Sequence, residues 1–140
     1  MPTLPPDEAV LEHLAGAGLG LVAAPASGAN GFTGQVQPPL EGLVPYRTVF
    51  CLLLGRGKND AIQGDGTSKK VFHVQVRVRV EAGENAAGQV LARACLDALH
   101  GAEPSGYAYC LANSPAPADL GNDPHGLPEW SFTVRLGTIA

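Results

Sequence analysis

A chain of 140 residues with 45% hydrophobic residues is expected to form one domain, covering residues 1–140, around a substantial apolar core. Its net charge of −4 argues against a free-standing nucleic-acid-binding protein. Charged residues make up only 16%, below the usual share of about a quarter, and this favours a protein that assembles with other chains.

The N-terminal segment MPTLPPDEAV has neither the basic cluster nor the apolar run of an export signal, and no segment reaches membrane-spanning length. Cys51, Cys95 and Cys110 lie in apolar runs and cannot all pair within the chain. Their setting fits free thiols in a reducing compartment.

The first expected element is a helix over Pro6–Ala15. Proline and acidic residues in its first turn are start signals, and Val10, Leu11 and Leu14 give it an apolar stripe. Glycines from Gly16 onward end it. Residues 23–46 are rich in Gly, Pro, Ser and Asn and predict a loop anchored by Phe32 and Val36.

Two strands follow, joined by a polar segment. RTVFCLLL, residues 47–54, is apolar on both faces and predicts a central strand. FHVQVRVRV, residues 72–80, alternates strictly, with Phe and Val on one face and His, Gln and Arg on the other. The linking residues 55–70 are longer than an ordinary hairpin turn and predict a working or disordered loop.

A second helix is expected over residues 84–100, then strands over residues 106–112 and 129–136, with a loop at 113–127 between them. The order is therefore α-β-β-α-β-β. It predicts the α+β class, with a single, mostly antiparallel four-stranded sheet and two helices packed on it. The expected buried stripe of the second helix consists of Ala87, Leu91, Ala94, Cys95, Ala98 and Leu99.

Charge is segregated along the chain. Residues 44–80 carry seven bases against Asp60 and Asp65, a local charge of +5, whereas the segments before and after carry −4 and −5. Such segregation suits contact between copies or a basic lining inside an acidic exterior. The basic strand face could equally be solvated or paired with acids such as Glu129. The candidate interface or lumen-lining residues are Arg56, Lys58, Lys69, Lys70, Arg77 and Arg79.

No constellation for catalysis stands out. The glycine-rich stretches GAGLG, GRGKN and GDGTSKK lack the spacing or context of a phosphate-binding loop. Asp119, Asn122, Asp123 and His125 could in principle hold a cation, but their spacing matches no known metal-binding loop, and turn chemistry explains these residue types. The cysteines have no adjacent base. We therefore expect no catalytic, cofactor-binding or metal-binding residues and no enzyme.

Five pieces of the chain occur in a familiar order: LEHLAGAGLGLV, ANGFTGQVQPP, VFHVQVRVRV, ARACLDALHG and GLPEWSFTVRL. Together they span most of the 140 residues. In this pattern the chain resembles the tail-terminator and minor capsid (head–tail joining) proteins of long-tailed bacteriophages.

The resemblance implies a structural virion protein in the tail or neck, present in the host cytoplasm during assembly. It implies a homohexameric ring that caps the tail tube, stops its polymerisation and joins it to the head. The implied partners are copies of itself, the tail tube protein and neck or connector proteins. DNA would pass through the lumen without sequence readout, and no cofactor or membrane is involved. Ring contacts would fall on residues 55–70 and 113–127.

Three alternatives remain open. The chain could occupy another neck position as a connector or completion protein. It could be a small DNA-binding module that uses Arg77, Arg79, Lys69 and Lys70, or a small enzyme that uses the loop from Asp119 to His125.

Overall fold

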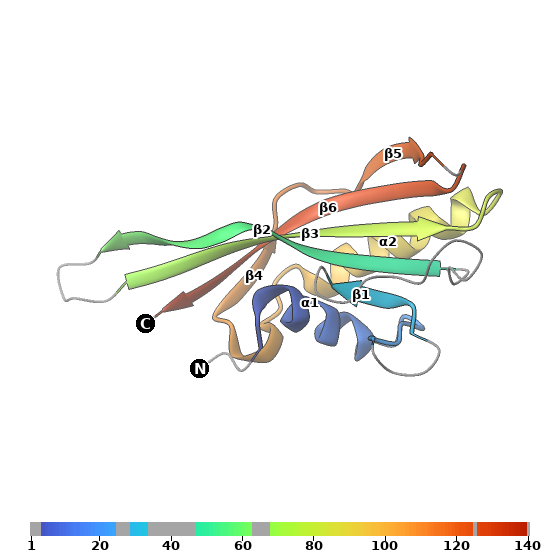
Figure 1. Cartoon of the computed structure of the whole chain (residues 1–140). Coiled ribbons are helices and arrows are strands. Elements are labelled where there is room, and N and C mark those ends of the chain that lie inside the picture. The colour runs from blue at the N-terminus through green and yellow to red at the C-terminus, as the bar shows by residue number, and fades with distance from the viewer. Residues whose placement is uncertain (1–3, 25–28, 34–46, 63–67, 125, 140) are drawn as a thin grey trace.

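A computed structural model describes residues 4–24, 29–33, 47–62, 68–124 and 126–139. Within residues 55–69, and at Ile139, the description is limited to the backbone. Two α-helices lie on one side of a mixed sheet that has six strands in the described part of the chain (Figure 1). The predicted α+β class is confirmed.

The first helix, α1, spans Pro6–Ala15, as its start and stop signals predict. Proline occupies its first turn together with Asp7 and Glu8, which suits the positive end of the helix dipole. Glycines follow it directly, and Gly18 and Gly20 have positive φ, a conformation that glycine adopts without a steric penalty. Its buried stripe includes the predicted Val10, Leu11 and Leu14.

The sheet is built around three long neighbouring strands, β2 (Arg47–Ile62), β3 (Ser68–Val80) and β6 (Pro128–Ile139), which pair antiparallel. β4 (Tyr109–Ala112) pairs antiparallel with one end of β6, and β5 (Ala118–Asn122) pairs antiparallel with the other end. β1 (Gly31–Thr33) pairs parallel with β2. The order along the sheet is β1-β2-β3-β6-β4, with β5 beside β6.

The predicted sheet of four strands is only partly matched. The four predicted strands correspond to β2, β3, β4 and β6, but β1 and β5 lie in segments that we expected to be loops. Both are short and lack side-chain alternation: β1 is buried throughout and β5 is exposed throughout. Their strand conformation depends on pairing with β2 and β6, which the sequence pattern of the segment itself does not reveal.

The second helix, α2 (Asn85–Leu99), packs on the same face of the sheet as α1 (Figure 1). Its observed buried residues are Gly88, Leu91, Ala92, Cys95, Leu96 and Leu99, a stripe turned slightly from the predicted one. The difference arises at Gly88, where the helix lies so close to Trp130 and Val80 that a Cβ atom would overlap the indole ring. The missing side chain lets helix and sheet approach closely.

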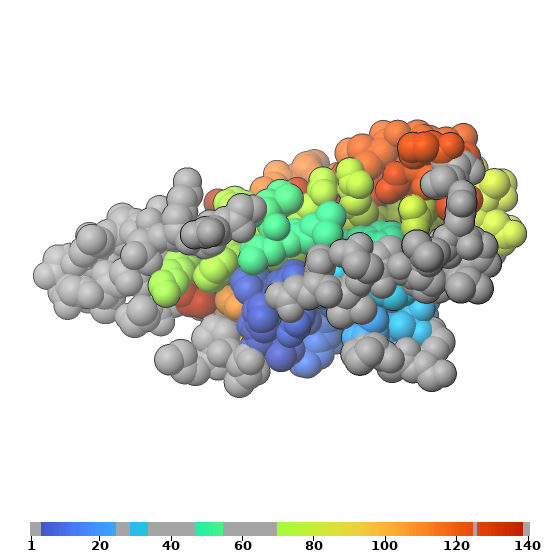
Figure 2. Space-filling view, viewed as in Figure 1, coloured from blue at the N-terminus to red at the C-terminus, as the bar shows by residue number. Residues whose placement is uncertain are grey.

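The core lies between the sheet and the two helices. β3 contributes the predicted dry face, with Val74, Val76, Val78 and Val80 all buried, and β6 contributes Trp130, Phe132, Val134 and Leu136. In the space-filling view, α1 packs directly against the sheet layer, while β5 stands at the margin of the molecule (Figure 2). The alternation of β3 and β6 therefore separates a helix-covered face from a polar face.

The predicted strand at residues 106–112 begins later than expected. A short 3-10 turn, Pro104–Gly106, contains Ser105 at φ 49°, and Tyr107 then packs on the helix side. The Tyr107 hydroxyl donates a hydrogen bond to the Leu4 carbonyl at 2.9 Å, and its ring meets Phe72 edge to face. Within β4 it is Cys110 that enters the core.

The long hairpin of β2 and β3 is the most distinctive feature of the fold. Strand pairing continues beyond Leu54 through Lys58↔Val71 and Asn59↔Lys70 to Ile62↔Ser68, with two register shifts. The predicted loop at 55–70 is therefore largely a paired arm that extends past the helix-covered body (Figure 1). Polar and glycine-rich residues can form this ladder because its hydrogen bonds come from the backbone.

Candidate assembly interface

The basic residues of β3 lie where the alternation predicts, on the polar face of the sheet. His73, Gln75, Arg77 and Arg79 face away from the helices, and each is half-buried. Their partners across β6 are, in the same order, Arg135, Thr133, Ser131 and Glu129. This group of eight residues is called the polar face below.

Arg79 is held within its own chain. Its Nη1 atom donates to Oδ2 of Asp123 at 3.2 Å, in an ion pair whose side chains are only 18% and 4% exposed. Its guanidinium carbon lies 5.0 Å from the centroid of the Phe50 ring, a cation–π contact. Arg79 is therefore an organising residue of the sheet rather than a freely available cation.

The ion-pair partner differs from the one expected. Glu129 lies directly across from Arg79 on β6, yet the guanidinium reaches Asp123 in the turn that follows β5. Asp123 also accepts a hydrogen bond from the Leu127 backbone amide through Oδ1 at 2.8 Å. The carboxylate thus fixes both the turn and the arginine.

Arg77 lies two residues away on the same strand, and no ion pair among the described residues includes it. Its Nε atom is buried and lacks a hydrogen-bond partner in the described part of the chain. A buried donor of this kind has a free-energy cost unless a partner satisfies it. The Nε atom of Arg79 is buried without a partner in the same way, so Arg77 differs from Arg79 in lacking an ion pair among the described residues.

The remaining candidates lie on the hairpin arm. Lys70 is exposed, and in the strand ladder it lies opposite Asn59 and Thr138. The same arm contains Arg56, Lys58 and Lys69. The structure describes their backbone, and their side chains lie outside the described part. The structure thus divides the six candidates between the polar face, with Arg77 and Arg79, and the arm.

The cysteines are free and buried, as their apolar settings predict. Burial raises the pKa of Cys95 and of Cys110 to about 12, and it raises the pKa of Cys51 further, with smaller contributions from Cys95 and Asp7. A thiol with such a pKa carries almost no thiolate near neutral pH. These side chains act as small apolar groups of the core.

The described residues of the candidate cation loop do not form a cluster of metal ligands. Asp123 is engaged by Arg79 and Leu127, and Asp119 accepts a hydrogen bond from the backbone of Gly121. No group of three or more metal-ligating side chains comes together among the residues described, and His125 lies outside them. No helix in the described ranges has the length and apolar character needed to cross a membrane.

Two features escaped the sequence interpretation. One is the Arg79–Asp123 ion pair, because a turn that folds back beside β3 is a tertiary feature. The other is the exposure of Leu53 and Leu54, at 37% and 43%, in a strand expected to be central. The length of the polar segment 55–70 was the available signal that β2 continues beyond the body.

Comparison of the sequence with protein-family models and with curated proteins gives no match. The functional interpretation therefore depends on the geometry of the chain and on the resemblance described above.

Proposed function

We propose that the protein is a structural virion component that assembles into a ring, most specifically a tail terminator that caps the tail tube. In this role the ring stops tube polymerisation and joins the tube to the neck. The observation that carries the proposal is the β2–β3 arm, a paired hairpin that extends past the helix-covered body.

The arm favours assembly for a physical reason. One side of the arm is covered, because β3 pairs with β6 as far as Lys69↔Ile139, but no strand among the described residues pairs with the outer side of β2 there. Its exposed backbone edge and the leucines at its base become stabilising once another subunit covers them. The segregation of charge along the chain also suits contact between copies, in which a basic segment of one copy meets an acidic segment of the next.

The state of the basic residues also bears on the choice between assembly and nucleic-acid recognition. Arg79 is already paired with Asp123 and stacked on Phe50, so a surface for reading bases would lose one of its expected contacts. A mildly basic lining past which DNA moves needs no base contacts. Ring assembly therefore agrees better with the geometry than a sequence-specific DNA-binding module does.

A hairpin-shortening variant tests this proposal. Replacing residues 56–71 by Asn-Gly continues the Leu54↔His73 register into a two-residue turn and removes the arm. We expect the shortened chain to keep its helical circular dichroism and cooperative unfolding but to lose self-association and binding to tail tubes. A folded, shortened chain that assembles as well as the intact one would contradict the proposal.

A further inference from the structure

Among the described residues, the outer edge of β2 has no strand partner next to the arm. β1 pairs with β2 only as far as Cys51, and beyond it no strand covers the outer side of β2 in the part of the chain that the structure describes. Leu53 and Leu54 lie at this edge and are among the exposed large hydrophobic residues. Register shifts interrupt β2 beyond Leu54, and a bulge is one way in which proteins protect an edge, but Leu52–Leu54 keeps a regular register and carries two adjacent exposed leucines, which favour a partner strand there.

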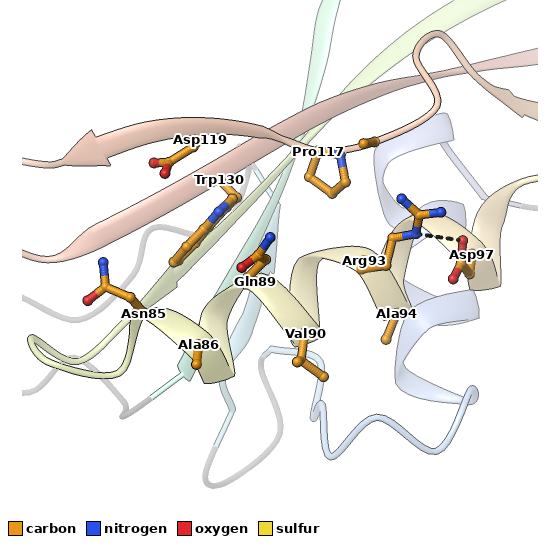
Figure 3. A pocket seen from close by; sticks show the side chains of 11 residues that line it. Asn85, Ala86, Gln89, Val90, Arg93, Ala94, Asp97, Pro117, Asp119 and Trp130 are labelled. Carbon is orange, nitrogen blue, oxygen red and sulfur yellow. Dashed lines mark ion pairs between the residues drawn. The ribbon is translucent and has the colours of Figure 1, made fainter.

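A groove with matching features lies at the opposite margin of the sheet. It has a volume of about 780 Å³ and runs between α2 and β5, with Trp130, Gln89, Val90, Pro117 and Asp119 among its lining residues (Figure 3). Val90 is 69% exposed on α2. β5 is exposed along its whole length and pairs only with β6, so its outer edge has no strand partner among the described residues.

The two margins complement each other in shape and charge. Leu53 points to the helix side of its sheet, since its register partner Val74 is in the core, and Lys70 follows on that same side of the arm. The groove offers an apolar wall and the carboxylate of Asp119. Lys70 is exposed on the arm and Asp119 is exposed at the groove, whereas Arg79 and Asp123 already pair with each other within the chain.

We infer that the β2 edge at Leu52–Leu54 of one copy adds to the β5 edge of a second copy, with Leu53 entering the α2–β5 groove beside Val90. A strand that joins a sheet edge gains backbone hydrogen bonds, and its alternate side chains enter the adjoining groove. The two surfaces differ, so the contact is heterologous and propagates around a ring. This inference rests on the proposed assembly and specifies which two surfaces form it.

Cross-linking between two variants, each with one added surface cysteine, tests the contact. Leu53→Cys and Val90→Cys chains are mixed at high protein concentration and treated with a short bismaleimide, while light scattering records association. The native thiols are buried with raised pKa values, so they react slowly. We expect a cross-linked dimer in the mixture, and none with the unmodified chain or with Glu12→Cys paired with Val90→Cys.

A second measurement covers the case in which labelling disturbs folding. Val90→Asp places a charge on an exposed helix position and is expected to weaken association about tenfold or more. Glu12→Lys on α1 is the control and is expected to leave association unchanged. If the chains still associate, but no cross-link forms and Val90→Asp has no effect on association, the proposed edge contact is wrong. Ring assembly through other surfaces would remain possible. A chain that stays monomeric at every concentration, both alone and in the presence of tail tubes, would contradict both.

Discussion

Arg79 on β3 forms an ion pair with Asp123 beyond the end of β5, with Nη1 and Oδ2 3.2 Å apart. The pair crosses β6 and joins the middle of the sheet to the turn that leads into β6. Since the Asp123 side chain is only 4% exposed, removing its cationic partner leaves a nearly buried carboxylate.

Arg79→Met is therefore expected to lower the free energy of unfolding by about 2 to 4 kcal/mol. The methionine keeps most of the apolar stem while it removes the charge and the cation–π contact with Phe50. Chemical denaturation measures the loss. Arg93→Met is the matched control, because Arg93 and Asp97 form an i,i+4 pair that is 55% and 62% exposed. Arg93→Met is expected to lower the free energy of unfolding by less than about 0.5 kcal/mol. Equal losses of stability in the two variants would contradict a special role for Arg79.

Gly88→Ala is expected to destabilise the fold although alanine favours a helix. The new Cβ atom would overlap the Trp130 ring and approach a Val80 methyl at 2.8 Å. Overpacking costs about 1 to 3 kcal/mol, which exceeds the gain of up to about 1 kcal/mol from helix propensity. Gln89→Ala, at an exposed position of α2, should be nearly neutral in the same thermal unfolding assay. A stabilised Gly88→Ala variant would show that α2 does not lie this close to the sheet.

Much of this architecture follows from local sequence rules. The bounds of α1 follow from proline, acidic residues and glycine in the expected places, and the alternation of β3 and β6 assigns each residue to its face. The strands β1 and β5 cannot be predicted from local sequence rules. Segments of three to five residues without alternation become strands only by pairing with a neighbouring strand. The sequence predicts a loop at residues 55–70 because alternation marks burial on one face, and this polar, glycine-rich segment has no alternation.

The candidate site was predictable to a smaller extent. The position of Arg77 and Arg79 on one face follows from the two-residue period. The choice of Asp123 over Glu129 as ion-pair partner does not, because it depends on the way the turn after β5 folds toward β3. Charge segregation was visible from the sequence, whereas the free β2 edge required the strand order of the sheet.

The buried thiols predict a loss of stability at alkaline pH. Burial raises the pKa of Cys95 and Cys110 from 9.0 to about 12, so the folded state favours the protonated thiols. Their contribution is complete below pH 9 and is lost as the pH rises from 9 towards 12, because the unfolded chain then releases protons that the folded chain retains. Each thiol contributes a slope of up to about 1.4 kcal/mol per pH unit in that window.

Urea denaturation at several pH values measures this slope. Cys95→Ala is expected to lower stability at pH 7 through a smaller side chain but to flatten the decline above pH 9. A decline of equal steepness in the variant would mean that Cys95 is accessible to water in the folded state.

Binding to DNA is expected to be weak, sensitive to salt and equal for unrelated duplex sequences. Lys70→Ala removes one exposed cation and should reduce the slope of log K against log salt by no more than about 0.9. Fluorescence anisotropy with two unrelated duplexes at several salt concentrations measures both properties. A strong preference for one duplex that Arg77→Ala abolishes would instead support the DNA-binding alternative.

The central claim is that copies of this chain form a ring at the end of a tail tube. The most direct measurement is the mass of the purified chain by light scattering, alone and mixed with tubes assembled from the tube protein of the same particle, with electron microscopy of the tube ends. We expect a particle of about six times the monomer mass, formed alone or on contact with tubes, and a cap on the tube ends. A strict monomer that never binds the tubes would contradict it.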